Sequence, residues 1–131
     1  MKLMKVVSAK EALKRLTASH FSNYKILRKL VQLRKAVDAE VEFYAEAEKR
    51  AVEQFAEKDG NGNPIFLSDG RLKLKSPADK IAFESEITKL GETAVDGIEP
   101  VLIHEADFLS SSELPTPEDI LLLDGIVIFE E

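Results

Sequence analysis

The sequence predicts a single α+β domain, residues 1–131, built around one long helix. All six glycines and all five prolines lie after residue 59, so the first 59 residues contain none of the residues that interrupt helices most strongly. The rest of the chain holds short apolar runs separated by Gly, Pro and Asp, which is typical of strands and turns. With 44% hydrophobic and 32% charged residues, the chain is apolar enough to form a core.

The N-terminal segment is expected to contain a short strand and then a helix. The strand is predicted over Lys2 to Val7. Ser8, with Glu11 three residues later, matches a capping box, which predicts a helix that weakens between Thr17 and His20. The apolar positions of that helix are Ala9, Ala12, Leu13 and Leu16.

A second, much longer helix is predicted from Ser22 or Asn23, either of which can serve as N-cap, to about Lys58. Its apolar residues recur near heptad spacing, which indicates an amphipathic helix that packs along its length. The segment Asp59-Gly60-Asn61-Gly62-Asn63-Pro64 is expected to end it. The apolar positions that form the candidate interaction surface are Leu27, Leu30, Val37, Val41, Tyr44 and Phe55.

The segment after the long helix is predicted to be a β-hairpin followed by a shorter helix. The hairpin covers residues 65–75 with a two-residue type I′ turn at Asp69-Gly70. Ser76 is expected to cap the shorter helix with Pro77 at its first position, and its apolar stripe is Phe83, Ile87, Leu90 and Ala94. We therefore expect the long and the shorter helix to pair as an antiparallel helical hairpin around the intervening β-hairpin.

A small strand and helix segment is predicted at the C-terminal end. Ile98 to Ile103 is expected to be a strand, Thr116 to Leu123 a short helix, and Ile126 to Phe129 a buried strand.

The length of the long helix predicts self-association. About 36 residues at 1.5 Å per residue span roughly 54 Å, whereas a compact chain of this size has a diameter of only about 36 Å. The helix is therefore longer than the domain that should cover it, and its uncovered stretch must pack on the N-terminal helix, on the C-terminal segment or on another molecule. The alternative is a break near Val37 or Asp38 that folds the helix back on itself.

Charge is strongly polarised along the chain. Residues 1–35 carry ten Lys or Arg against Glu11 alone, and the remaining residues carry eight Lys or Arg against 23 Asp or Glu. Because the cations alternate with leucines as on a solvated helix face, we expect them to pair with acidic segments of the same chain or of a second copy. Nucleic-acid binding through Lys25, Arg28 and Lys29 is the alternative.

No residue is predicted to be catalytic, to bind a cofactor or to bind a metal. Asp59, Asn61 and Asn63 imitate the start of a calcium loop, but Pro64 and Gly70 stand where its glycine and bidentate glutamate are needed. His104, Glu105 and Asp107 gather ligand types without a ligand spacing, and Glu118 and Asp119 suit the first turn of a helix, where carboxylates favour the dipole. The sequence has no cysteine, which excludes disulfides and thiolate chemistry.

The order of elements resembles that of small uncharacterised proteins of tailed phages and prophages. The resemblance covers most of the chain. It is carried by the long charged helix closing in Phe55-Ala56-Glu57-Lys58-Asp59-Gly60-Asn61-Gly62, a turn-rich β segment, the helix Phe83-x-x-Glu86-Ile87-x-x-Leu90, and the tail Pro117-Glu118-Asp119-Ile120-Leu121-x-Leu123. It implies an accessory or structural role and no catalytic residues.

We therefore predict a non-enzymatic phage- or prophage-derived accessory or structural protein that acts through protein–protein contacts and self-assembly. The expected partner is a second copy or a phage or host protein, with no small-molecule substrate. The sequence holds no apolar stretch of membrane-spanning length, so no membrane partner is predicted. We expect it in the cytoplasm of the host cell or in the virion. The alternative function is a nucleic-acid-binding accessory factor that uses the basic N-terminal helices.

Overall fold

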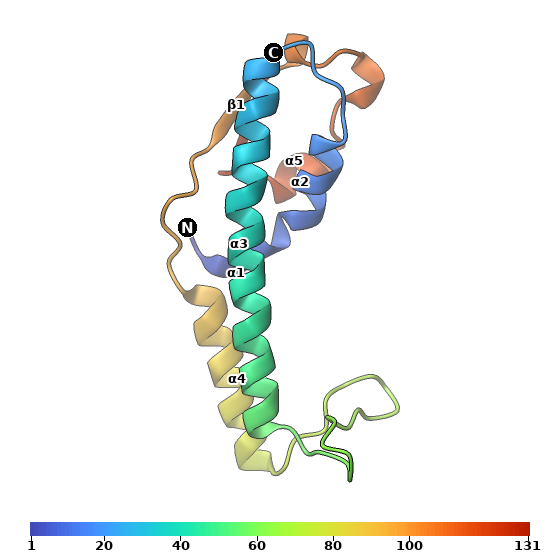
Figure 1. Cartoon of the computed structure of the whole chain (residues 1–131), viewed down its shortest axis with the longest axis vertical. Coiled ribbons are helices and arrows are strands. Elements are labelled where there is room, and N and C mark those ends of the chain that lie inside the picture. Colours follow the sequence, from blue (N-terminus) through green and yellow to red (C-terminus); the bar gives the residue numbers. More distant parts are fainter.

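The predicted α+β class is confirmed in the computed structural model, which describes residues 1–131 apart from the side chain of Ser111 (Figure 1). The helices are α1 (Leu3–Ser8), α2 (Lys10–Thr17), α3 (Tyr24–Phe55), α4 (Pro77–Glu92) and α5 (Pro117–Leu122), with short 3₁₀ helices η1 (Glu105–Asp107) and η2 (Ser111–Glu113). The strands are β1 (Val101–His104) and β2 (Val127–Glu130).

Helix α3 is continuous over 32 residues, so the alternative of a break near Val37 or Asp38 is wrong. At 1.5 Å per residue it is about 48 Å long. Asn23 provides the N-cap, since its side chain accepts a hydrogen bond from the backbone N–H of Lys25. The helix ends three residues before Lys58 because the backbone of Glu57 pairs with the following loop, donating to Lys73 and accepting from Ile65.

The predicted strand over Lys2 to Val7 is wrong, because this segment forms α1. Leu3 and Val6 are buried at a three-residue spacing that suits a helix lying against its neighbours and not a strand. The predicted capping box is also wrong: the Ser8 hydroxyl donates to the carbonyl of Met4, and Ala9 precedes α2 with no side-chain cap. Burial of one helical face therefore outweighs the local capping signal.

The segment predicted to be a β-hairpin forms isolated β-bridges, among them Phe66 with Leu72. It contains no continuous β-strand. Its turn is not type I′, because that turn needs positive φ at two residues and only Gly70 has it, at 86°. Gly70 N–H donates to the Leu67 carbonyl at 2.9 Å, and Leu67 N–H donates to the Arg71 carbonyl at 2.7 Å. This is a three-residue loop with glycine in the left-handed position.

Helix α4 begins as predicted, with Ser76 as N-cap accepting from the backbone N–H of Asp79 and Pro77 in the first turn. It lies beside the C-terminal half of α3 and runs back along it (Figure 1). Phe55 and Phe83 meet edge to face where the two helices come together, with ring centroids 6.4 Å apart. Farther along α4, Gly91 lies against Met4 of α1.

Strands β1 and β2 form a two-stranded parallel sheet in which Val101 pairs with Val127 and His104 with Glu130. The first strand begins at Val101, later than predicted, directly after Pro100, which has no N–H to donate to a sheet. Helix α5 lies between the strands in sequence and is capped by the hydroxyl of Thr116.

The hydrophobic core lies between the first half of α3, helices α1 and α2, and the C-terminal segment. Its largest fully buried side chains are Leu3, Leu13, Leu30, Ile103, Leu123, Ile126, Val6 and Val37. No helix of the described residues is both long and apolar enough to cross a membrane.

Candidate functional site

The six residues of the predicted interaction surface lie on the face of α3 that the chain itself covers. Leu30, Val37 and Phe55 are buried. Leu27, Val41 and Tyr44 are partly buried and pack against the core. The heptad-like pattern therefore marked the helix face that carries packing, and the structure uses its first half to build the core.

Beyond the buried core, α3 and α4 form a projection that we call the arm, residues 42–90, whose base packs against the core through Tyr44 and Leu90 (Figure 1). Phe55 and Ala56 are its only buried residues among those that the structure describes. The apolar stripe of α4, including Phe83, Ile87 and Leu90, is no more than partly buried. The arm therefore holds two helices together by a thin apolar seam.

Several large apolar side chains of the arm remain in contact with solvent. Ile81 on α4 is 71% exposed and Phe43 on α3 is 53% exposed. Two hollows run along α3 in the same region. One, of about 240 Å³, lies between Ala47 and Ala51 of α3 and Ile87 of α4. The other, of about 360 Å³, lies between α3 and the loop that follows it.

The basic N-terminal segment and the acidic C-terminal segment meet in part, as the charge pattern predicts. Arg15 of α2 forms a salt bridge with Asp119 of α5 at 2.5 Å. The hydrogen bond from Arg15 lowers the pKa of this buried carboxyl group. Lys5 donates to the backbone carbonyls of Leu121 and Leu122 at the end of α5, where cations favour the helix dipole.

Most of the N-terminal cations stay outside such pairs. Lys25, Arg28, Lys29 and Lys35 are exposed on the first turns of α3, and no carboxylate of the described residues lies within salt-bridge distance of them. Tyr24, the first residue of the helix, is 81% exposed beside them. This face therefore presents free positive charge together with an aromatic ring.

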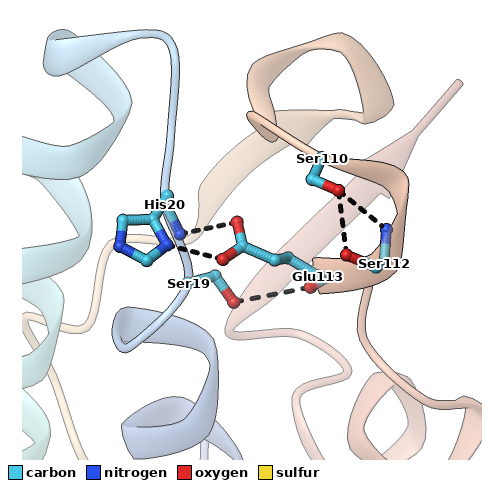
Figure 2. A network of polar contacts seen from close by, with 5 residues as sticks. All are labelled: Ser19, His20, Ser110, Ser112 and Glu113. Atoms are coloured by element: carbon cyan, nitrogen blue, oxygen red, sulfur yellow. Dashed lines mark hydrogen bonds and ion pairs between the residues drawn. The ribbon is translucent and has the colours of Figure 1, made fainter.

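A polar network joins the segment between α2 and α3 to η2 (Figure 2). The Glu113 carboxylate accepts a hydrogen bond from the backbone N–H of His20 at 2.9 Å and pairs with His20 Nδ1 at 2.6 Å. This hydrogen bond raises the pKa of His20 above 6.5 and lowers the pKa of Glu113 below 4.5. The two residues lie 93 positions apart, so no spacing in the sequence could have paired them.

The network does not assemble a nucleophile with a base. The hydroxyl of Ser19 donates to the backbone carbonyl of Glu113, and Ser110 and Ser112 bond to each other (Figure 2). In the part of the chain that the structure describes, no serine hydroxyl bonds to the imidazole of His20, as a nucleophile activated by a base requires. The contacts therefore fasten two loops together.

The residues with metal-ligand chemistry are used in turns. The Asp59 carboxylate accepts hydrogen bonds from the backbone N–H groups of Asn61 and Asn63, which stabilise the loop after α3. Asp107 caps η1 by accepting from the backbone N–H of His104. Among the described side chains, no three His, Asp or Glu are placed to hold a metal ion together.

Comparison with models of protein families, with curated proteins and with solved structures finds no match to this chain. A proposal about its function therefore rests on the contacts, burial and charges of the chain itself.

Proposed function

We propose that this is a non-enzymatic interaction and assembly protein whose arm is its contact surface. The observation that carries the proposal is the missing core of the arm: over residues 42–90 only Phe55 and Ala56 are buried. Isolated pairs of helices gain little stability from propensity alone, because most helical stability comes from packing of an apolar face. An arm with a thin seam and exposed apolar side chains gains stability when a partner covers it.

The partner that best fits the arm is a second copy of the arm. Residues 42–90 carry ten Asp or Glu and eight Lys or Arg, interspersed along both helices and the loop. A surface of mixed sign and low net charge does not repel its own copy, and two-fold symmetric contacts are the commonest form of homo-oligomer. Two antiparallel α3–α4 hairpins side by side would form a four-helix packing, a stable arrangement for amphipathic helices.

Light scattering coupled to size exclusion, over a range of protein concentrations, tests this proposal. We expect the full chain to run as a dimer or larger species, and the double variant Phe43→Ser with Ile81→Ser to run at a lower mass than the wild type at every concentration, since each copy has a mass of 14.6 kDa and loses its arm contact. Leu121→Ser is the matched control, since this side chain is 74% exposed but lies on α5, outside the arm. A wild-type monomer at every concentration, or equal effects of the arm and control variants, would contradict the proposal.

Nucleic-acid binding is a second candidate function, supported by the unpaired cations on the first turns of α3. The test is binding of duplex DNA at low and high salt by the wild type and by a Lys25→Gln, Arg28→Gln, Lys29→Gln variant. Phosphate contacts release counterions, so binding of this kind weakens steeply as salt rises. Absence of binding at low salt would exclude this function.

A further inference from the structure

An apolar pocket with an acidic rim lies at the C-terminal end of the chain. It has a volume of about 240 Å³ and is built from η1, the loop before α5, α5 itself and β2. Its apolar lining consists of Phe108, Leu114, Pro115, Ile120 and Phe129. Three exposed glutamates, Glu105, Glu130 and Glu131, complete the lining and form the rim of the pocket. We call it the acidic pocket.

The size of the acidic pocket suits one side chain better than a metabolite. Pockets that bury small organic ligands usually hold about 300–1,000 Å³, and this one is smaller and is lined mainly by aliphatic and aromatic groups. It therefore has the character of a hollow for a single apolar anchor.

The charge around the acidic pocket requires that the anchor be flanked by cations. Residues 90–131 hold eleven Asp or Glu and no Lys or Arg. Among the described side chains, His104 is the one basic group within salt-bridge distance of a rim glutamate, its Nδ1 lying 3.8 Å from Glu130. An acidic partner would be repelled by such a rim. A partner with basic side chains is attracted to it, and the charge pairs fix the orientation in which the partner binds.

The same chain presents an anchor of this chemistry at the start of α3. Tyr24 is 81% exposed and is followed by Lys25 and, one turn later, by Arg28, both exposed and without a carboxylate partner. Tyrosine and arginine are enriched among the residues that dominate binding energy at protein interfaces. We call Tyr24, Lys25 and Arg28 the Tyr24 knob.

We propose that the Tyr24 knob of one copy docks into the acidic pocket of a second copy. The aromatic ring fills the apolar hollow, and Lys25 and Arg28 meet the carboxylates of the rim. The knob and the pocket share no residue. Two copies can therefore exchange knobs in a closed two-fold dimer, or dock head-to-tail into a ring or an open chain of copies. The contact does not involve the arm and is independent of the proposed arm pairing.

Complementation between two variants tests this docking. Both are made in the full chain carrying Phe43→Ser and Ile81→Ser, which removes the proposed arm contact. The knob variant adds Tyr24→Ser and Arg28→Gln, and the pocket variant adds Ile120→Ser, Glu105→Gln and Glu130→Gln. We expect each variant alone to be monomeric and their mixture to give a 1:1 complex, because the knob variant keeps its pocket and the pocket variant keeps its knob. The parent with both surfaces intact should form a closed dimer or a larger species.

Salt separates the docking from an apolar contact. Opposite charges at an exposed interface are screened once the Debye length falls to about 3–4 Å, near 0.5–1 M salt, so the 1:1 complex should weaken at least tenfold there by sedimentation analysis. Thermal unfolding of each variant checks that its fold is intact, which is expected because all of the altered side chains are exposed.

Three results would overturn the proposal. The first is a mixture in which both variants stay monomeric, and the second is association of the parent that neither variant reduces. The third is a knob variant that loses duplex DNA binding but self-associates as the parent does. This result would mean that the Tyr24 knob binds nucleic acid and not a second copy.

Discussion

The two halves of α3 experience different surroundings although they carry the same amphipathic pattern. In the first half, Leu30, Leu33 and Val37 are buried under α1, α2 and the C-terminal segment. In the second half, the arm offers only α4 and a loop as cover, and Phe55 alone is buried. An apolar stripe on a helix becomes a core only where a second layer closes over it, and the stripe itself does not decide whether that happens.

The covering elements explain the difference. Around the first half of α3, side chains arrive from both ends of the chain, including Leu3, Leu13, Ile103 and Ile126. Around the second half, α4 contributes a single stripe, and the segment between the helices forms isolated bridges in place of a sheet. The core region thus closes over the apolar face of α3, whereas in the arm α3 is covered on one side only, by α4 and the loop.

Truncation in the core should have the largest effect on stability. Leu30→Ala removes a fully buried side chain and is expected to lower the free energy of unfolding by about 2–5 kcal/mol, because a cavity adds to the lost burial. Chemical denaturation of the two proteins measures it. Val31→Ala, at an exposed position one residue later, is the matched control and should change little. Similar losses for the two variants would contradict the assigned faces of α3.

The joint between the two regions is sensitive to added volume. A Cβ atom at Gly91 would lie 3.3 Å from the Cβ of Met4, where α4 leaves the arm and meets α1. Gly91→Val is therefore expected to destabilise the protein by about 1–3 kcal/mol through overpacking. Gly91→Ala should cost less, since alanine gains about 1 kcal/mol of helix propensity over glycine. A valine variant as stable as the wild type in thermal unfolding would show that the joint is loose.

The same kind of truncation in the arm should cost less than in the core. Ile87→Ala removes a partly buried side chain on α4 and is expected to lower the free energy of unfolding by about 1 kcal/mol. If the arm pairs with a second copy, this loss grows with protein concentration, because assembly then stabilises the wild type more than the variant. Denaturation at two concentrations measures both effects. A loss as large as that of Leu30→Ala would erase the difference between the regions.

The smallest expected effect is the pH dependence of the stability that the His20–Glu113 pair contributes. Its raised pKa gives stability that is complete below pH 6.5 and is lost as pH rises through the folded value. The lowered pKa of Glu113 gives stability above pH 4.5 that is lost as pH falls. Both contributions are present between these values. His20→Gln should therefore lower the denaturation midpoint slightly at about pH 5.5 and hardly at all at about pH 8.

Equal midpoint shifts at the two pH values would mean that His20 acts through packing alone. The partner variant Glu113→Gln provides the control, because it should lose the same pH-dependent stability at about pH 5.5.

The sequence predicted what local signals determine. The absence of glycine and proline before residue 59 indicated the long helix, and Ser76-Pro77 marked the start of α4. The misassigned segment at Lys2 to Val7 depended on tertiary burial, which a six-residue stretch does not reveal. The turn at Asp69-Gly70 was misassigned because the same dipeptide also fits the three-residue loop observed.

The candidate surfaces were harder to predict from the sequence than the helices. The apolar face of α3 was identified correctly, but its division into a covered and an uncovered half depends on where α4 and the C-terminal segment pack. The acidic pocket draws on residues from Glu105 to Glu131 that only the fold brings together, and the His20–Glu113 pair joins distant loops. Charge polarity was visible in the sequence, but the partners of individual charges were not.

The order in which a ribosome makes the chain has a consequence for its folding. The arm is a local unit, since residues 42–90 complete both of its helices, whereas the core needs Ile103, Leu123 and Ile126 from the last part of the chain. Contacts between distant residues form late and slowly. The arm is therefore complete while the apolar faces that α1, α2 and α3 turn toward the C-terminal segment are still uncovered. During that interval the nascent chain exposes those faces to chaperones and to neighbouring chains, and closure of the C-terminal segment ends the exposure.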